Sequence, residues 1–178
     1  MIKLALALLC CTLATPCLHA QANATATQRA GLQVGVEASA FNLDNSTGRE
    51  EGFGVYADFD VSKHLGVEAL YRDASIVTPQ DIGENHLLAG PRFHLTRGRF
   101  SPFAKVLVGE GTINYQQGFN ATTYSEHYFV YVLGGGLDVR VSRRISVRLL
   151  DLEYQSWPGF APHGLNPYGD SLGVAYHF

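Results

Sequence analysis

The feature that most constrains this chain is a strict alternation of apolar and polar residues, seen most clearly in its last eleven positions. From Ser171 onward, every second residue is apolar and the residues between are small or polar. Successive side chains point to opposite faces only in an extended strand. The apolar face of this closing strand is predicted to carry Leu172, Val174, Tyr176 and Phe178. The opposite face is predicted to carry Ser171, Gly173 and His177.

The same period of two recurs in seven earlier segments, separated by stretches rich in Gly, Ser, Asn and Thr. Together with the closing segment they predict eight strands, and they leave no long segment with helical periodicity. The seven segments are residues 32–41, 53–61, 65–72, 86–95, 100–111, 128–141 and 145–154.

The connections between these strands alternate in length. Those after the second, fourth and sixth strands are short, whereas residues 42–52, 73–85, 112–127 and 155–167 form long loops. Short turns at one end and long loops at the other are typical of outer-membrane barrels, whose turns are periplasmic and whose loops face outward. The prediction is an all-β, eight-stranded antiparallel up-and-down transmembrane β-barrel with both chain ends on the periplasmic side.

Two segments depart from regular strand patterns. Uninterrupted alternation through 145–154 would place Asp151 and Glu153 on the apolar face, so a one-residue bulge is predicted near Leu150 to return both acids to the polar face. Pro91 lies inside the fourth strand, where proline cannot donate to the ladder.

Charged residues of both signs share the polar faces of the strands. Eight strands enclose only enough room for side chains, so these charges are expected to pair inside the barrel. The predicted charge network comprises Glu37, Asp58, Glu68, Arg72, Arg92, Lys105, Asp138, Arg140 and Arg148. A soluble lipocalin-like barrel is the alternative, and it would turn the apolar faces inward instead.

Aromatic residues collect near the predicted strand ends, where a membrane barrel has its two interfacial girdles. The expected girdle residues are Phe41, Phe53, Phe59, Tyr71, Phe93, Phe100, Tyr115, Tyr154, Trp157, Tyr168 and Phe178.

The amino-terminal residues predict export. Residues 1–22 read as a signal peptide, with Lys3, an apolar run and the Ala20-Gln-Ala22 cleavage pattern. Residues 23–30 are predicted to be a flexible periplasmic lead-in, and residues 31–178 the outer-membrane β-barrel. All three cysteines lie in the signal, so no disulfide or thiolate metal site is expected in the mature chain. A net charge of −3 fits no nucleic-acid role.

Several blocks of sequence resemble the OmpA-like outer-membrane β-barrel domain family. The resemblance covers the whole mature chain and implies the architecture rather than any chemistry. It also implies that the closing aromatic strand is the signal by which the assembly machinery recognises the chain. A peptidoglycan-binding domain, present in longer relatives, is not expected, because the chain stops at Phe178. The blocks are residues 90–93, 101–109, 134–154 and 172–178.

Candidate chemistry is sparse. Some small outer-membrane barrels are lipid A deacylases with a His-x-Ser-Asn motif, but the nearest stretch here, His163 to Asn166, has Leu165 at the nucleophile position. The histidines show no metal spacing, so neither a cofactor nor a metal is expected. Arg143 and Arg144 in a predicted turn would suit lipid phosphates or simple solvation, and solvation is preferred.

The sequence therefore predicts a non-enzymatic outer-membrane protein that displays surface loops and contributes to the cell envelope. A narrow porin-like channel and a lipid A-modifying enzyme are the alternatives. The expected partners are outer-membrane lipid and lipopolysaccharide, the barrel-assembly machinery and an extracellular ligand at the loops. The protein is expected to be a monomer.

Overall fold

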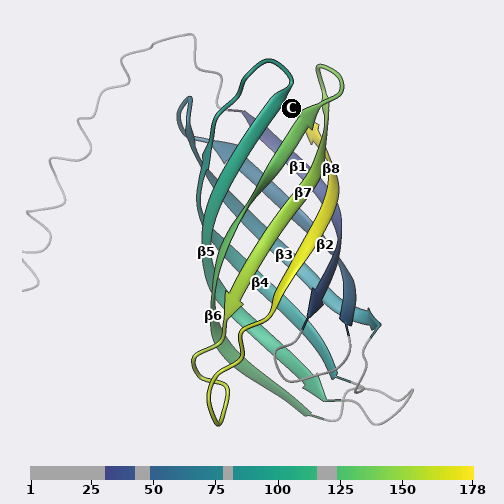
Figure 1. The fold of residues 1–178 in the computed structure, drawn as a ribbon, viewed down its shortest axis with the longest axis vertical. Helices are drawn as coiled ribbons and strands as arrows, with labels where there is room; N and C mark the ends of the chain where they lie inside the picture. The colour runs from purple at the N-terminus through teal and green to yellow at the C-terminus, as the bar shows by residue number, and fades with distance from the viewer. Residues whose placement is uncertain (1–30, 43–48, 78–81, 116–123) are drawn as a thin grey trace, which may run out of the picture.

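The computed structural model describes residues 31–42, 49–77, 82–115 and 124–178, which form a single closed antiparallel β-barrel. Each strand pairs with its neighbours in sequence, and β1 pairs with β8 to close the sheet (Figure 1). The strands are β1 (Leu32–Asn42), β2 (Arg49–Asp60), β3 (Leu65–Val77), β4 (Ile82–His94), β5 (Phe100–Tyr115), β6 (Tyr124–Arg140), β7 (Ile145–Ser156) and β8 (Tyr168–His177). The predicted fold class is confirmed. None of the described residues belongs to a helix able to cross a membrane.

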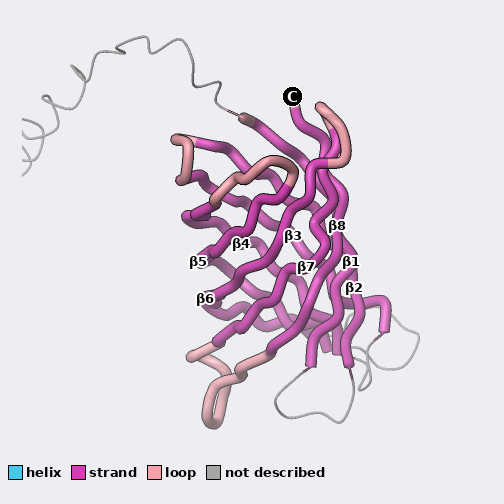
Figure 2. The backbone as a smooth tube through the Cα atoms, turned by 45° about the horizontal axis from the view of Figure 1, so that its top comes forward, coloured by secondary structure: helices cyan, strands magenta, loops and turns pink. Residues whose placement is uncertain are grey.

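The two ends of the barrel differ. The turns 61–64, 95–99 and 141–144 lie at one end with the carboxy-terminus, at the top of Figures 1 and 2. We call this the turn end and the opposite end the loop end. Several strands run further toward the loop end than predicted: β6 begins at Tyr124 instead of 128, and β5 continues to Tyr115. The loops are correspondingly shorter than expected. The predicted signal and lead-in, residues 1–30, lie outside the described residues.

The outer surface of the barrel is a continuous apolar band. Large apolar side chains from every strand are exposed, among them Val36, Phe53, Val67, Leu87, Val108, Leu133, Leu152 and Leu172. The polar faces of the same strands are turned inward and buried. A water-soluble barrel would have the reverse arrangement, so this surface requires an apolar solvent.

The predicted bulge is confirmed in β7. The register with β8 shifts between Arg148 and Asp151, and Leu149 and Leu150 both face outward. Asp151 and Glu153 are thereby buried inside the barrel. Opposite the bulge, a Cβ on Gly136 would lie 1.9 Å from the carbonyl oxygen of Leu150, so only glycine permits this close approach of β6 to β7.

Pro91 is accommodated without a break in β4. It is paired with Val67 of β3, and the β4–β5 register is the same on both sides of it, from Ala89↔Val108 to Arg92↔Lys105. The missing amide hydrogen therefore interrupts the ladder locally and leaves the strand's alternation intact.

Candidate functional site

Ten charged side chains meet inside the barrel and form what we call the interior charge network. They come from seven of the eight strands because the inward positions of all these strands converge on one lumen. Its members are Glu37, Asp58, Glu68, Arg72, Arg92, Lys105, Asp138, Arg148, Asp151 and Glu153, and all are buried.

Arg148 is the most highly connected cation of the network. Its guanidinium lies 3.1 Å from carboxylate oxygens of Asp58, Glu68 and Asp151 and 3.2 Å from Asp138. Its Cζ also lies 3.8 Å from the centroid of the Tyr56 ring. A planar guanidinium can satisfy several carboxylates and stack on an aromatic face at the same time, which an ammonium cannot do.

Lys105 and Arg72 extend the network toward the loop end. The Lys105 ammonium donates to Glu68 at 2.7 Å and to Asp151 at 2.6 Å, and it lies 2.8 Å from Glu153. Arg72 donates to Glu37 and Glu153, in both cases at 2.6 Å. Since Arg72 is on β3 and Glu153 on β7, this contact joins opposite walls and closes the lumen.

Eight of the nine residues predicted for the network lie in it. The ninth, Arg140, is exposed at the turn end and makes no ion pair with any described residue, so its prediction was wrong. It is the last residue of β6, where alternation no longer determines burial. Asp151 and Glu153 join the network as the predicted bulge requires.

Two predicted girdle aromatics are instead buried inside the barrel. Phe41 lies beneath Arg72, whose Cζ is 4.6 Å from its ring centroid, and Trp157 is fully buried. Phe41 shares its parity with Glu37, so simple alternation would have placed it correctly. Phe103 is an interior residue that the sequence-based predictions do not include, although it has the parity of Lys105. Its ring lies under Arg92 and Arg148.

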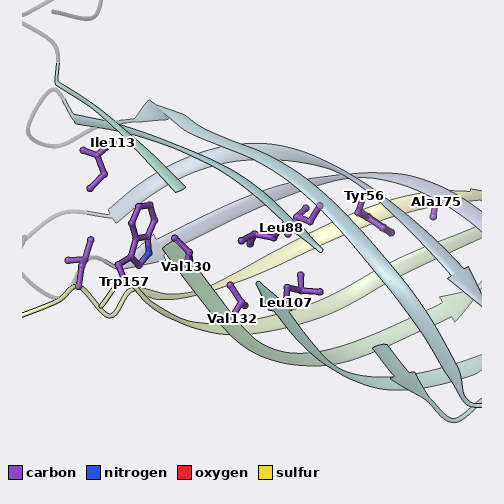
Figure 3. Packing of buried hydrophobic residues seen from close by; sticks show 10 residues of the cluster. Tyr56, Leu88, Leu107, Ile113, Val130, Val132, Trp157 and Ala175 are labelled. Atoms are coloured by element: carbon purple, nitrogen blue, oxygen red, sulfur yellow. The ribbon is translucent and has the colours of Figure 1, made fainter. Parts of the chain in front are cut away.

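Buried apolar side chains, which we call the apolar layer, fill the lumen mainly on the loop-end side of the network and continue past it to Ala175. Figure 3 shows buried apolar side chains extending along the interior from Ile113 and Trp157 toward Tyr56 and Ala175. Trp157 enters from the β7–β8 connection, where its backbone pairs with Leu165. Leu165 is also buried, so this connection folds back into the barrel and covers the apolar layer.

Glu50 and His86 are buried polar side chains of this loop-end half that lack side-chain hydrogen bonds to described residues. Both carboxylate oxygens of Glu50 and both ring nitrogens of His86 have no partner among the described residues. The His86 ring lies 3.6 Å from Glu84 and packs edge-on against Trp157. Described residues include no group of three or more side chains with metal-binding geometry.

The turn end opens into a small pocket of about 50 Å³, lined by Gln33, His94, Arg99, Arg140, Ser146 and His177. Arg92 and Asp138 of the network form its floor, joined by a hydrogen bond of 2.5 Å. The pocket therefore ends at the network and does not continue along the axis.

The deacylase-like stretch is not arranged for catalysis. His163 is exposed in the β7–β8 connection, whereas Leu165 is buried in the apolar layer. The residue at the nucleophile position thus packs against Trp157 and offers no reactive group.

A closed eight-stranded barrel with an apolar outer band and a charged, filled interior defines the class of small outer-membrane barrels. Residues 7–178 match the family profile described as outer membrane protein beta-barrel domain, and the chain belongs to this family. Short turns of such barrels are periplasmic, so we expect the turn end to be the periplasmic end and the loop end the outer end. No curated protein sequence matches the chain.

Solved structures share this fold at low sequence identity. Neisserial surface protein A is 15% identical with a TM-score of 0.66, and the match covers 84% of this chain and 100% of that chain. Ail of Yersinia pestis, solved with the heparin analogue sucrose octasulfate, is 16% identical with a TM-score of 0.53 and coverages of 84% and 97%. The N-terminal barrel domain of Pseudomonas aeruginosa OprF is 14% identical with a TM-score of 0.53 and coverages of 82% and 97%. These likenesses show the fold alone.

Proposed function

We propose that this protein is a non-catalytic outer-membrane barrel whose rigid body displays the loops of its outer end at the cell surface. The observation that carries the proposal is the filled lumen. Arg72 links opposite walls, Arg148 donates hydrogen bonds to four carboxylates, and Trp157 covers the apolar layer. A lumen filled in this way supports a platform better than a passage.

A conductance measurement distinguishes the proposed loop-displaying barrel from the alternative, a narrow channel. We expect the refolded protein to give no stepwise current in planar lipid bilayers, because the interior charge network closes the lumen. Insertion is verified independently by the slower gel migration of a boiled sample. Regular unitary currents from inserted wild-type protein would overturn the proposal.

An assay with purified lipid A distinguishes the proposed non-catalytic barrel from the alternative, a lipid A-modifying enzyme. Mass spectrometry should find no fatty acid released by the refolded protein, because Leu165 supplies no nucleophile. Ser171 carries a buried hydroxyl on β8, eight positions after His163 in the chain, and the variant Ser171→Ala removes it. Deacylation by wild type that is lost in Ser171→Ala would favour the enzyme.

The charge of the outer end limits the class of partner. Among described residues at this end, Glu51, Glu110 and Asp170 are acidic, and Arg49 is a cation already paired with Asp170. The connecting segments 43–48, 78–81, 116–123 and 157–167 contain no Lys or Arg. We therefore propose a neutral or cationic partner for this end, unlike the sulfated ligand in the Ail structure. Binding to immobilised heparin at physiological salt would contradict this.

We also propose that the apolar face of β8 and the final residue serve as the assembly signal. Leu172, Val174, Tyr176 and Phe178 all face outward, and Phe178 is the most exposed of them at 78%. Its backbone amide donates to Leu32, so the residue lies beside the seam that closes the barrel. Deleting Phe178 should reduce the heat-modifiable, membrane-inserted fraction in cells, and normal insertion of the truncated chain would refute the role.

A further inference from the structure

Six cationic side chains lie at the turn end of the barrel, and two of them, Arg99 and Arg140, also line the turn-end pocket. We call the six side chains the basic rim: all are exposed, and none has a carboxylate of a described residue within 4 Å. They are Lys63, Arg97, Arg99, Arg140, Arg143 and Arg144. The acidic side chains of described residues at this end are Asp60, which faces His94, and Asp138, which belongs to the interior charge network.

Two turns hold their cations in the same way. In the turn between β2 and β3, the Ser62 hydroxyl accepts from the backbone of Leu65 at 3.1 Å. In the turn between β6 and β7, the Ser142 hydroxyl accepts from Ile145 at 3.1 Å and from Arg144 at 3.2 Å. These hydrogen bonds fix the backbone that presents Lys63, Arg143 and Arg144.

The third turn is a tight hairpin. Arg97 and Phe100 exchange backbone hydrogen bonds of 2.8 and 3.1 Å, and Gly98 between them has a φ of +63°. Glycine tolerates this left-handed conformation without strain. Arg97 and Arg99 are therefore also held at defined positions.

The rim lies at the edge of the apolar band. An exposed apolar residue precedes and follows each turn, and these residues are 44–59% exposed: Val61, Leu65, Leu95, Phe100, Val141 and Ile145. In a membrane, such residues mark the boundary of the hydrocarbon. The cations one or two positions away then lie at the depth of the lipid phosphates.

Five of the six cations lie on the β4–β5 and β6–β7 turns and at the end of β6, where the Arg140 amide donates to the Arg99 carbonyl at 2.7 Å, and Lys63 lies on the β2–β3 turn. The three turns join alternate strand pairs of a closed eight-stranded barrel, and the fourth place is taken by the chain ends (Figure 2). Exposed cations at the edge of an outward apolar band, at the depth of the lipid phosphates, fit anionic lipid headgroups as their partner.

We propose that the basic rim binds the headgroups of anionic phospholipids in the periplasmic leaflet. The sequence favoured solvation for Arg143 and Arg144, but the fold adds four further cations at the same depth. Each cation near an anionic lipid surface strengthens the association of a protein with that lipid about fivefold. The rim thereby fixes the depth and the tilt of the barrel from its periplasmic side.

The test measures lipid selectivity around the intact protein. Wild type is refolded into phosphatidylcholine vesicles that contain trace spin-labelled phosphatidylglycerol or spin-labelled phosphatidylcholine. The motionally restricted fraction of each label gives the relative association. We expect a preference for phosphatidylglycerol of about fivefold or more, removed by about 1 M NaCl because salt screens exposed charges.

Three variants assign the preference to the rim. The combined variant R97Q/R99Q/R143Q/R144Q should lose most of the preference, and R143Q/R144Q should lose part of it. Arg49→Gln removes a cation from the other end and should leave the preference unchanged. Heat-modifiable gel migration confirms folding of each variant. If the combined variant does not fold, R143Q/R144Q and the salt series decide.

Two results would overturn the proposal. Equal restriction of phosphatidylglycerol and phosphatidylcholine by wild type would show that the rim is merely solvated. An unchanged preference in folded R97Q/R99Q/R143Q/R144Q, or in R143Q/R144Q where the combined variant does not fold, would show that another surface selects the lipid.

Discussion

Glu153 and Glu50 are both buried glutamates on the inner wall of the barrel, but their surroundings differ. Glu153 lies 2.6 Å from Arg72 and 2.8 Å from Lys105. Glu50 has no hydrogen-bond partner for either oxygen among described residues and lies in the half where the apolar layer and Trp157 fill the lumen. Cations and hydrogen bonds of the network offset the burial of the Glu153 carboxylate, whereas no described residue does so for the Glu50 carboxyl group.

This difference shows where the barrel obtains its internal stability. A buried carboxylate costs free energy to desolvate, and that cost is offset only by well-placed cations and hydrogen bonds. In the half of the barrel that holds the network, most buried carboxylates have such cations and hydrogen bonds beside them. The loop-end half relies on apolar packing and retains polar groups that weaken it, so the two halves should respond differently to mutation.

Arg148→Met should have the largest effect on stability. It leaves Asp58, Glu68, Asp138 and Asp151 without their common cation, and breaking a buried ion pair costs roughly 3–5 kcal/mol. The loss is measured by reversible urea unfolding in lipid vesicles, followed by fluorescence of Trp157, the single tryptophan.

Arg143→Met is the matched control. It makes the same chemical change on the exposed turn and should alter the free energy of unfolding by no more than about 0.5 kcal/mol. Equal losses in the two variants would contradict the assignment of stability to the network.

Trp157→Ala should be the next most disruptive change, at about 3 kcal/mol, because it empties the largest buried side-chain volume of the apolar layer. The β7–β8 connection should also become sensitive to added protease, since it loses the anchor beside Leu165. Unfolding is followed by circular dichroism, and Phe160→Ala, which truncates a partly buried neighbour, should cost less.

The pair Glu153→Gln and Glu50→Gln tests the comparison most directly. Glu153→Gln weakens charge-assisted hydrogen bonds and should cost about 2 kcal/mol. Glu50→Gln replaces a buried carboxyl group that has no hydrogen bond among described residues, and it should change stability by about 1 kcal/mol or less, toward greater stability. Destabilisation of both variants to the same extent would mean that Glu50 is compensated as well.

The alternation of residues was sufficient to predict the strand count, the turn end and the outward apolar faces. Even the bulge in β7 followed from the sequence, because Asp151 and Glu153 could reach the interior only after one extra residue. These features depend on the direction of each side chain, which period two determines.

Other features depend on how far a side chain or a strand extends. Arg140 has the parity of the network but lies at a strand end, where its side chain reaches solvent. Trp157 comes after the last residue of β7, so its entry into the lumen depends on its backbone pairing with Leu165. The sequence pattern places the loop-end parts of β5 and β6 in loops, because polar residues such as Thr112 and His127 interrupt the alternation. In the structure these two side chains hydrogen-bond to each other across the strands.

The cross-lumen contact between Arg72 and Glu153 also has a consequence for the order of assembly. Its two strands, β3 and β7, are on opposite sides of an eight-membered ring, and the residues are 81 positions apart in the chain. No isolated hairpin can form this contact. A sheet that lacks β7 exposes Arg72 and Lys105 without Glu153, at a free-energy penalty in hydrocarbon. The interior chemistry thus favours the bilayer entry of a completed ring over that of its intermediates.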